Sequence, residues 1–410
     1  MRELIINNVG PIREARLNMD QLLMLVGPQG QGKSTIAKLF SFFLWLEKYV
    51  VSRQKADTVC SDEFIRERLI RYHRMESFFS EGTHLSYKSD VLNFSLSGGK
   101  KLRMAMVPDS IYEATTGKIG YIPAERMVLG LQGIASLRME DDYIRDFIFD
   151  WLSVRNKYGL DNKMSLLNLQ MDYYFDSAGG RDNILLRGEK EIPVYESSSG
   201  VQSITPIIVF YDYLTKWIYE NKEDISFEQR ENLKIGYINL LNHIDNRVIS
   251  PSPEIAEHLI KLFEAAKASK ELETKISQDD IISHMLSVWE RISKPHFSHI
   301  IVEEPELSIY PETQIQLLAH MLRNIDFVRG DGLLITTHSP YLLNALNLFF
   351  KAYDTKQTVL GASLDFDKTG VYYVDNGGIV DIKAKNAHLV NPEHLSAPLD
   401  DIYEQYEGLS

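Results

Sequence analysis

The chain has 410 residues, of which 44% are hydrophobic and 25% charged, values that exclude a disordered or fibrous protein. We expect one elaborated globular domain or two lobes. The formal net charge of −13 argues against a surface dedicated to nucleic acid or anionic membranes. The single cysteine, Cys60, excludes an internal disulfide and a cysteine-rich zinc site. With no secretory signal and no apolar run long enough to span a bilayer, a cytoplasmic protein without membrane contact is expected.

The N-terminal third predicts a strand, glycine loop and helix unit, followed by short strands. Strands are expected at 3–7 and 22–26, and a helix at 34–51. After a second helix at 62–75, alternating apolar residues predict three strands, at 85–87, 91–96 and 102–107. These short strands indicate an antiparallel β subdomain after the first helix.

The middle of the chain mixes strands and helices. A strand at 119–122 ends at a proline, and residues 140–175 are predicted to be mostly helical. A hairpin is expected to pair 183–186 with 192–195, and a helix to cover 201–219.

A polar segment at 221–293 predicts a helical insertion that divides the main domain into residues 1–220 and 294–410. Beyond it, buried strands are predicted at 299–302 and 332–336, on either side of a helix at 313–325. The overall fold class is therefore α/β, with a mainly parallel core sheet.

A phosphate loop lies between the strand at 22–26 and the helix that follows. Its sequence is Gly27-Pro-Gln-Gly30-Gln-Gly32-Lys33-Ser34-Thr35. In this pattern glycines let backbone N–H groups surround phosphates, lysine reaches the terminal phosphates, and serine ligates magnesium. Gly27, Gly30, Gly32, Lys33, Ser34 and Thr35 are therefore the predicted ATP-binding residues, and Ser34 is also a predicted Mg²⁺ ligand.

Two adjacent carboxylates follow the predicted strand at 299–302, in the order Glu303-Glu304-Pro-Glu306. Phosphoryl transfer needs one carboxylate to hold magnesium and a group to orient the attacking water. Glu303 suits the first role and Glu304 the second, which is the arrangement called Walker B. An acidic pair alone is typical of a solvated strand end, and the phosphate loop is what favours the catalytic interpretation.

The last predicted core strand ends at Thr336-Thr-His338-Ser-Pro340. A histidine at the end of a buried strand beside a phosphate site is placed to contact a γ-phosphate. Together with Lys33 and Glu304, His338 is a predicted catalytic residue.

The order of these motifs resembles the ABC ATPase superfamily, in particular its SMC-like and RecF-like branch with the AAA-15 and AAA-21 ATPases and the heads of OLD proteins. The strings that carry the resemblance are Asn8 to Ile12, Gly27 to Thr35, Tyr121 to Arg126, Ser198 to Gln202, Glu303 to Glu306 and Thr336 to Pro340. Ser197 stands where the family usually has leucine.

The resemblance implies that ATP is sandwiched between two copies of the chain. Ser198 and Gly200 belong to the family's signature loop, which contacts the γ-phosphate of ATP held by another subunit. A homodimer or higher homo-oligomer is therefore expected, with ATP and Mg²⁺ at the interface. Arg126 and Gln132 lie where the family has its Q-loop connection, although the glutamine is poorly placed and the pattern favours a structural role.

Two other sets of charged residues are functional candidates. The arginines at 66, 68, 71 and 74 form either a solvated helix face or a phosphate-contacting ridge. The resemblance implies a Toprim nuclease domain after some OLD heads, but only about 70 residues follow His338 here, too few for one. A strand pair and a terminal acidic helix account for the aspartates of this tail.

The sequence therefore predicts an ATPase that switches a separate effector protein, as the resemblance to stand-alone defence ATPases of bacteria implies. One alternative is a RecF-like or SMC-like DNA-repair head, which the acidic charge disfavours. A second is a nucleotide-gated scaffold with little hydrolysis, suggested by glutamate instead of aspartate at position 303.

Overall fold

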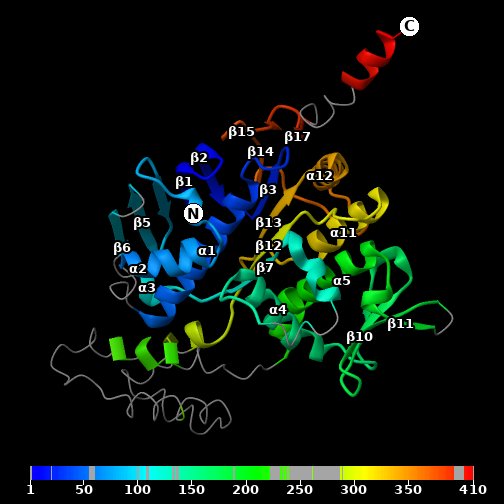
Figure 1. The fold of residues 1–410 in the computed structure, drawn as a ribbon, viewed down its shortest axis with the longest axis horizontal. Helices are drawn as coiled ribbons and strands as arrows, with labels where there is room; N and C mark the ends of the chain where they lie inside the picture. Colours follow the sequence, from blue (N-terminus) through cyan, green and yellow to red (C-terminus); the bar gives the residue numbers. More distant parts are fainter. Residues whose placement is uncertain are drawn as a thin grey trace.

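The computed structural model describes residues 2–19, 21–54, 61–98, 101–107, 110–131, 134, 138–187, 190–221, 231–232, 234–236, 238–239, 261, 287–288, 290–391 and 401–409. Figure 1 shows a central sheet with helices on both sides.

The central sheet has six strands in the order β15-β14-β3-β13-β12-β7. They are β3 (Leu22–Val26), β7 (Lys118–Ile122), β12 (Ser298–Glu303), β13 (Gly332–Thr337), β14 (Thr369–Asp375) and β15 (Gly378–Asp381). All neighbours pair in parallel except β15, which returns antiparallel to β14 at the edge. The predicted mainly parallel core sheet is confirmed.

Both faces of this sheet are covered, which explains its unbroken apolar strands. Every residue of β3, β12 and β13 is buried, as expected when helices cover both faces of parallel strands. Helix α1 (Lys33–Arg53) packs on one face, and α5 (Ser199–Asp212), α11 (Pro311–Asn324) and α12 (Pro340–Asp354) pack on the other. Each face of the sheet therefore has its own hydrophobic core. Helix α12 was not predicted.

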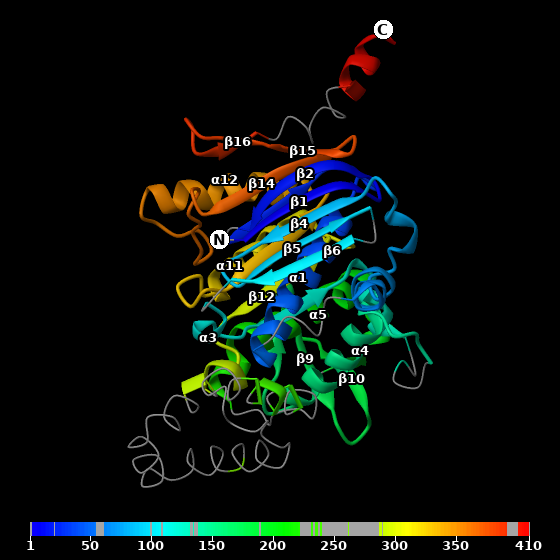
Figure 2. The same cartoon turned by 90° about the vertical axis from the view of Figure 1, so that its left-hand side faces the viewer.

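A second, antiparallel sheet lies beyond α1 in the order β2-β1-β4-β5-β6 (Figure 2). Its strands are β1 (Arg2–Val9), β2 (Ile12–Met19), β4 (His84–Lys88), β5 (Leu92–Ser97) and β6 (Lys101–Met106). The predicted antiparallel unit is present, but it also takes up the first strand of the chain. Strand β2 was not predicted; a tight turn at Gly10, whose φ is 51°, folds it back onto β1.

The prediction of mostly helical structure over 140–175 is wrong in its second half. Helix α4 (Tyr143–Val154) and a 3-10 turn, η6 (Arg155–Lys157), are followed by strands β8 (Met164–Ser165) and β9 (Asp172–Asp176). Strand β9 pairs with β10 (Arg181–Leu185), which pairs with β11 (Glu191–Pro193) as the predicted hairpin requires. The turn at Ser177-Ala-Gly-Gly180 connects β9 to β10 and is the sequence signal that the helical interpretation overlooked.

The other elements are short. Helix α2 (Asp62–Ile65) continues as a π-helix, η2 (Arg66–Arg71), so the predicted helix at 62–75 ends early. Helix α5 continues into η9 (Tyr213–Trp217) and α6 (Ile218–Glu220), in agreement with the predicted helix. The remaining elements are η3 (Glu76–Phe78), α3 (Ser110–Glu113), η4 (Ala124–Gly130), η7 (Leu167–Leu169), η8 (Val194–Glu196), β16 (Lys383–Ala384) and β17 (Leu389–Val390).

Most of the predicted insertion at 221–293 lies outside the described residues. Its described residues at 231–232, 234–236, 238–239 and 290–293 are helical, and Asn232 and Asn239 hydrogen-bond to Arg53 at the end of α1. After α12, strands β14 and β15 supply the predicted strand pair, and residues 401–407 form the predicted terminal helix.

Candidate nucleotide site

The phosphate loop connects the end of β3 to the start of α1 and depends on its glycines. Gly27, Gly30 and Gly32 have φ values of 147°, 75° and 104°, a region that side chains disfavour. A Cβ atom at Gly27 would lie 2.2 Å from the carbonyl oxygen of Val374, and one at Gly32 would lie 2.4 Å from Ile12. A side chain at Gly27 or Gly32 would therefore clash, and the positive φ of all three positions favours glycine.

Lys33 begins α1, and its ammonium group curls back over the loop. Its Nζ donates to the carbonyl oxygens of Gly27 at 2.8 Å and Pro28 at 2.7 Å. Burial lowers the pKa of Lys33 to about 8, although Glu304, Glu306 and Glu303 favour the charged form. The three carboxylates therefore offset part of the cost of burying the ammonium.

The strand order brings the predicted site residues to one edge of the sheet. Strand β13, which leads to His338, lies between the phosphate-loop strand β3 and the Walker B strand β12. In register, Val26 is opposite Thr337 and Thr336 is opposite Glu303. Since parallel strands end at the same edge, the three motifs meet there.

Glu303 is almost fully enclosed, with 2% of its surface exposed. Burial raises its pKa, while the Ser34 hydroxyl, Lys38 and Tyr121 stabilise the charged form. Its Oε2 accepts a long hydrogen bond from the N–H of Ala124 at 3.4 Å, and its Oε1 is buried without a hydrogen-bond partner.

Glu303 and Ser34 fit a magnesium site. An unpartnered buried carboxylate oxygen beside a serine hydroxyl is an oxygen donor set of the kind that Mg²⁺ takes, with water and substrate phosphates as its other ligands. Glutamate in place of aspartate does not remove this fit, because the Ser34 hydroxyl stabilises the charged form of its carboxylate. Within the described ranges, no group of three or more His, Cys, Asp or Glu side chains is placed to hold a metal unaided.

Glu304 and His338 are in direct contact. Nε2 of His338 lies 3.1 Å from Oε1 of Glu304, and its Nδ1 lies 3.4 Å from Nζ of Lys33. Because lysine can only donate, Nδ1 is the acceptor and Nε2 carries the proton that His338 donates to Glu304. This hydrogen bond lowers the pKa of Glu304, which is therefore ionised at neutral pH.

Glu304 also has an unusual backbone, with a φ of 44°. A left-handed conformation at a residue with a side chain costs of order 1–2 kcal/mol and persists only where its surroundings enforce it. Here the N–H of Glu304 donates to the carbonyl oxygen of Thr336 on β13 at 2.9 Å.

Glu306 is a site residue that the sequence did not single out. Its Oε1 accepts a hydrogen bond from the backbone N–H of His338 at 2.6 Å, and its Oε2 is buried without a partner among the described residues. Burial raises its pKa. The carboxylate fixes the loop after β13 and thereby the direction in which His338 leaves the strand.

Arg126, interpreted from sequence as either a Q-loop residue or a structural one, is fully buried beneath the Walker B loop. It is 0% exposed, and its guanidinium donates to oxygens of Pro123, Ser203, Glu303 and Glu304. Burial lowers its pKa to about 10. Gln132, the other Q-loop candidate, lies outside the described residues.

The signature loop, residues Ser197–Gln202, is not part of this cluster. Ser198 caps α5 by accepting a hydrogen bond from the N–H of Val201, and Gln202 donates to the carbonyl oxygens of Tyr195 and Ser197. Within the part of the chain that the structure describes, none of the hydrogen bonds of this loop reaches the phosphate loop of the same chain.

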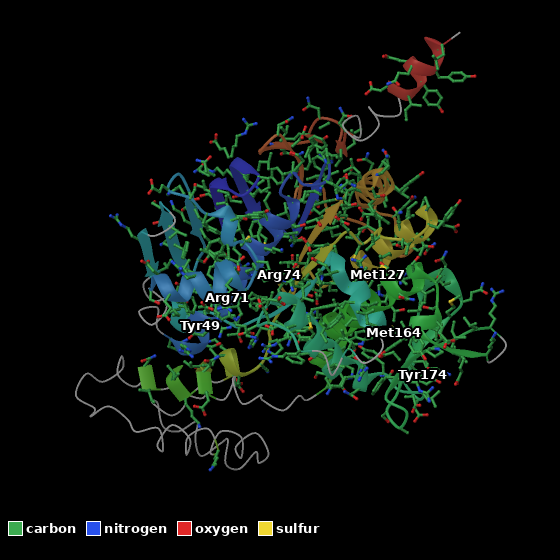
Figure 3. All side chains as sticks on the ribbon, viewed as in Figure 1. Tyr49, Arg71, Arg74, Met127, Met164 and Tyr174 are labelled. Atoms are coloured by element: carbon green, nitrogen blue, oxygen red, sulfur yellow. The ribbon has the colours of Figure 1, made fainter. Side chains whose placement is uncertain are left out.

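The arginines at 66, 68, 71 and 74 do not form a continuous free ridge. Arg74 forms an ion pair with Asp142, Arg71 lies 3.5 Å from Glu67, and the guanidinium of Arg68 lies 5.7 Å from the ring centre of Trp45. Figure 3 labels Arg71 and Arg74 beside one another on the α1 side of the molecule. Three of the four arginines therefore have structural contacts.

The aspartates of the C-terminal segment have local partners as well. Asp365 accepts from the hydroxyl of Tyr353, Asp375 from the N–H of Asn376, and Asp381 from the N–H of Lys383. They support turns and strand ends, as predicted. A search of the described helices finds no segment long and apolar enough to cross a membrane.

Comparison with known proteins gives similarity at the level of structure. No protein-family model matches the chain, and no curated protein matches its sequence. It is similar to the SMC head domain from Thermotoga maritima, with 10% identity, a TM-score of 0.35 and coverage of 93% of this chain and 98% of that one.

Two other similar structures belong to related classes. The recombination mediator protein RecF of the RecFOR pathway gives 9% identity, a TM-score of 0.28 and coverage of 93% and 97%. The ATP-binding cassette of an ABC transporter, in its ADP conformation, gives 12% identity, a TM-score of 0.29 and coverage of 100% and 99%. These are the classes of ATPase head that the motif order resembles, but likenesses this distant carry no argument about activity.

Proposed function

We propose that the chain is an ABC-type ATPase of the SMC/RecF-like branch that binds and hydrolyses ATP and acts as a switch for a separate effector protein. The observation that carries this proposal is the contiguous set Lys33, His338 and Glu304 beside the phosphate loop. An ammonium, an imidazole and an ionised carboxylate in contact at the carboxyl edge of a parallel sheet suit phosphoryl transfer to water.

The phosphate loop and the first turn of α1 bind ATP. Gly27, Gly30 and Gly32 let the backbone N–H groups approach the phosphates, and the amino end of α1, including Thr35, favours their negative charge. Lys33 exchanges its two carbonyl partners for the terminal phosphates. Ser34 and Glu303 hold Mg²⁺, which neutralises charge on the β- and γ-phosphates when bound.

Hydrolysis requires a base beside the attacking water. Glu304 is ionised and, among the described residues, its side chain accepts a hydrogen bond from His338 alone, at Oε1, so Oε2 can orient a water molecule. The water oxygen forms a bond to the γ-phosphorus, the bond from this phosphorus to the bridging oxygen of ADP breaks, and the water proton passes to Glu304. His338 contacts the γ-phosphate and holds Glu304 in place.

The proposed site is completed by a second copy of the chain. Ser198 and Gly200 at the amino end of α5 contact the γ-phosphate of ATP bound to the other subunit, so ATP joins the two heads. This places the signature loop in a role that fits its separation from the phosphate loop of its own chain.

For the effector, the proposal follows the resemblance to stand-alone ATPases of bacterial anti-phage defence. The chain would bind a separately encoded nuclease or toxin and change its activity with the state of ATP. The DNA-repair alternative has weaker support, since Arg68, Arg71 and Arg74 are engaged in structural contacts.

The proposal is tested with the purified chain. Phosphate release in the presence of ATP and Mg²⁺, together with a doubling of the mass by light scattering when ATP but not ADP is added, is the expected result. A chain that binds ATP and dimerises but releases no phosphate would support the scaffold alternative. A chain whose mass does not respond to ATP would contradict the proposed composite site.

A further inference from the structure

Arg126 occupies an unusual position between the Walker B loop and the signature helix. Its side chain has no exposed surface, and the hydrogen bonds that it donates go to uncharged oxygens. Burying a guanidinium without a direct carboxylate partner is costly and is tolerated only where all its donors are satisfied.

All five N–H groups of Arg126 are in fact used. Nη1 donates to the carbonyl oxygens of Glu303 at 2.8 Å and Pro123 at 3.2 Å. Nη2 donates to the carbonyl oxygen of Glu304 at 2.7 Å and to Oγ of Ser203 at 2.9 Å, and Nε donates to the carbonyl oxygen of Ser203 at 3.0 Å. The fork therefore joins three segments: the end of β7, the Walker B loop and α5.

On the Walker B side, Arg126 holds the backbone of the proposed base. The two carbonyl groups that it binds belong to Glu303 and Glu304, and the φ angle of Glu304, which lies between them, is in the left-handed region at 44°. A conformation of this kind needs support from its surroundings, and Arg126 supplies it from beneath. The direction of the Glu304 carboxylate therefore depends on the position of Arg126.

On the other side, Arg126 is fixed by α5. Ser203 directly follows the signature loop on α5 and is itself fully buried. The start of α5 also touches the loop after Walker B, since a Cβ atom at Gly200 would lie 2.7 Å from the carbonyl oxygen of Ser308. A displacement of α5 therefore reaches the Walker B loop at two points.

We propose that Arg126 is a positioning residue that couples the two ATP sites of a dimer. This inference rests on the proposed function, in which α5 of one chain contacts ATP held by the other. When this contact forms, α5 and Ser203 fix the position of Arg126. Arg126 in turn fixes the backbone of Glu303 and Glu304, whose side chains act on the ATP bound to the same chain. Each site then hydrolyses ATP efficiently only when the other is occupied.

The test compares two buried hydroxyls on the same helix. Ser203→Ala removes one acceptor of Arg126, whereas Thr205→Val removes a hydroxyl that only donates to the carbonyl oxygen of Val201 within α5. Arg126→Lys keeps the charge but loses the planar fork. The readouts are kcat and the Hill coefficient for ATP hydrolysis, the affinity for a fluorescent ATP analogue, and the melting temperature.

We expect wild-type and Thr205→Val protein to hydrolyse ATP with a Hill coefficient well above 1. Ser203→Ala and Arg126→Lys should keep nucleotide affinity, lower kcat about tenfold and reduce the Hill coefficient towards 1, since a hydrogen bond to a charged group is lost. If Arg126→Lys does not fold, Ser203→Ala carries the test alone.

Unchanged kcat and Hill coefficient in folded Ser203→Ala protein would overturn the inference, as would an equal loss in Thr205→Val. Absence of ATP hydrolysis in the wild type would instead overturn the proposed function. The two failures are therefore distinguishable.

Discussion

The phosphate-loop cluster and the signature loop differ in how much of a site each one forms. In the cluster of Lys33, Glu303, Glu304 and His338, His338 contacts both Lys33 and Glu304, and a buried carboxylate oxygen of Glu303 has no hydrogen-bond partner in the described part of the chain. The signature loop satisfies its own helix cap and hydrogen-bonds to its own neighbours. In the proposed function the first region hydrolyses ATP, and the second contacts ATP bound to another subunit.

The comparison also shows what connects the two regions. Arg126 hydrogen-bonds to the carbonyl groups of Glu303 and Glu304 and to Ser203 of α5, so it joins the two regions within one chain. The following experiments separate the role of each region, beginning with the largest expected effect.

Replacing the proposed base should have the largest effect. Glu304→Gln keeps the shape of the side chain but removes the charge that accepts the water proton, so kcat should fall about 10²–10⁴-fold while ATP still binds. Dimers should then accumulate in ATP. The measurement is phosphate release with light scattering, and Glu312→Gln on the exposed start of α11 is the control. Equal loss in the control, or unchanged turnover in Glu304→Gln, would contradict the assignment.

Removing the imidazole should have a smaller effect. His338→Ala takes away the donor to Glu304 and the proposed contact to the γ-phosphate, and we expect a loss of kcat of about 10²-fold. The pKa of Glu304 should rise, because the hydrogen bond that lowers it is gone. The kcat–pH profile should therefore lose activity on its acid side at a higher pH than in the wild type. If the acid side of the kcat–pH profile is the same in His338→Ala as in the wild type, the hydrogen bond between His338 and Glu304 is not formed in the working enzyme.

The charge of Lys33 predicts a loss of activity at alkaline pH. Burial lowers its pKa to about 8, so the ammonium that binds phosphate is deprotonated as pH rises through this value. The kcat/KM for ATP, which reports the free enzyme, should fall about tenfold per pH unit above it. In Lys33→Arg the guanidinium stays charged, and whatever activity remains should lack this alkaline fall. A flat wild-type profile up to pH 10 would disprove the role of Lys33.

The smallest effect on turnover is expected at the segment that carries the arginines at 66, 68, 71 and 74. Asp142 is buried, caps α4 and forms the ion pair with Arg74, so Asp142→Ala should lower the free energy of unfolding by about 1 kcal/mol. ATP turnover should be unchanged. Urea unfolding measures the free energy of unfolding, and phosphate release measures ATP turnover. Asp141→Ala, at an exposed position, is the matched control. A large loss of turnover in Asp142→Ala alone would give this segment a functional role.

The sequence predicted the residues of the phosphate-loop cluster because their signals are local. Glycines before Lys33, two carboxylates after a buried strand and a histidine after another are each readable within about ten residues. Their meeting at one edge follows from parallel strands, although the insertion of β13 between β3 and β12 could not be read from the chain.

Other features depended on contacts distant in sequence. The partners of Arg126 come from Pro123, Ser203 and the Walker B loop, and no local pattern distinguishes such an arginine from an exposed one. Glu306 was overlooked because its partner, the N–H of His338, is supplied by a different strand. The strand β9 was missed because its aromatic residues fit a helix as well as a strand until the glycine turn after them is considered.

The most direct test of the composite site mixes two inactive variants. Lys33→Ala disables the phosphate loop but keeps the signature loop, and Ser198→Arg does the reverse. In a mixed dimer one site combines the intact phosphate loop of one chain with the intact signature loop of the other. With the two variants carrying different tags to verify mixed dimers, the account predicts that ATP hydrolysis returns on mixing, at a lower rate per intact site than in the wild type because the other site is empty. Mixed dimers as inactive as either parent would contradict it.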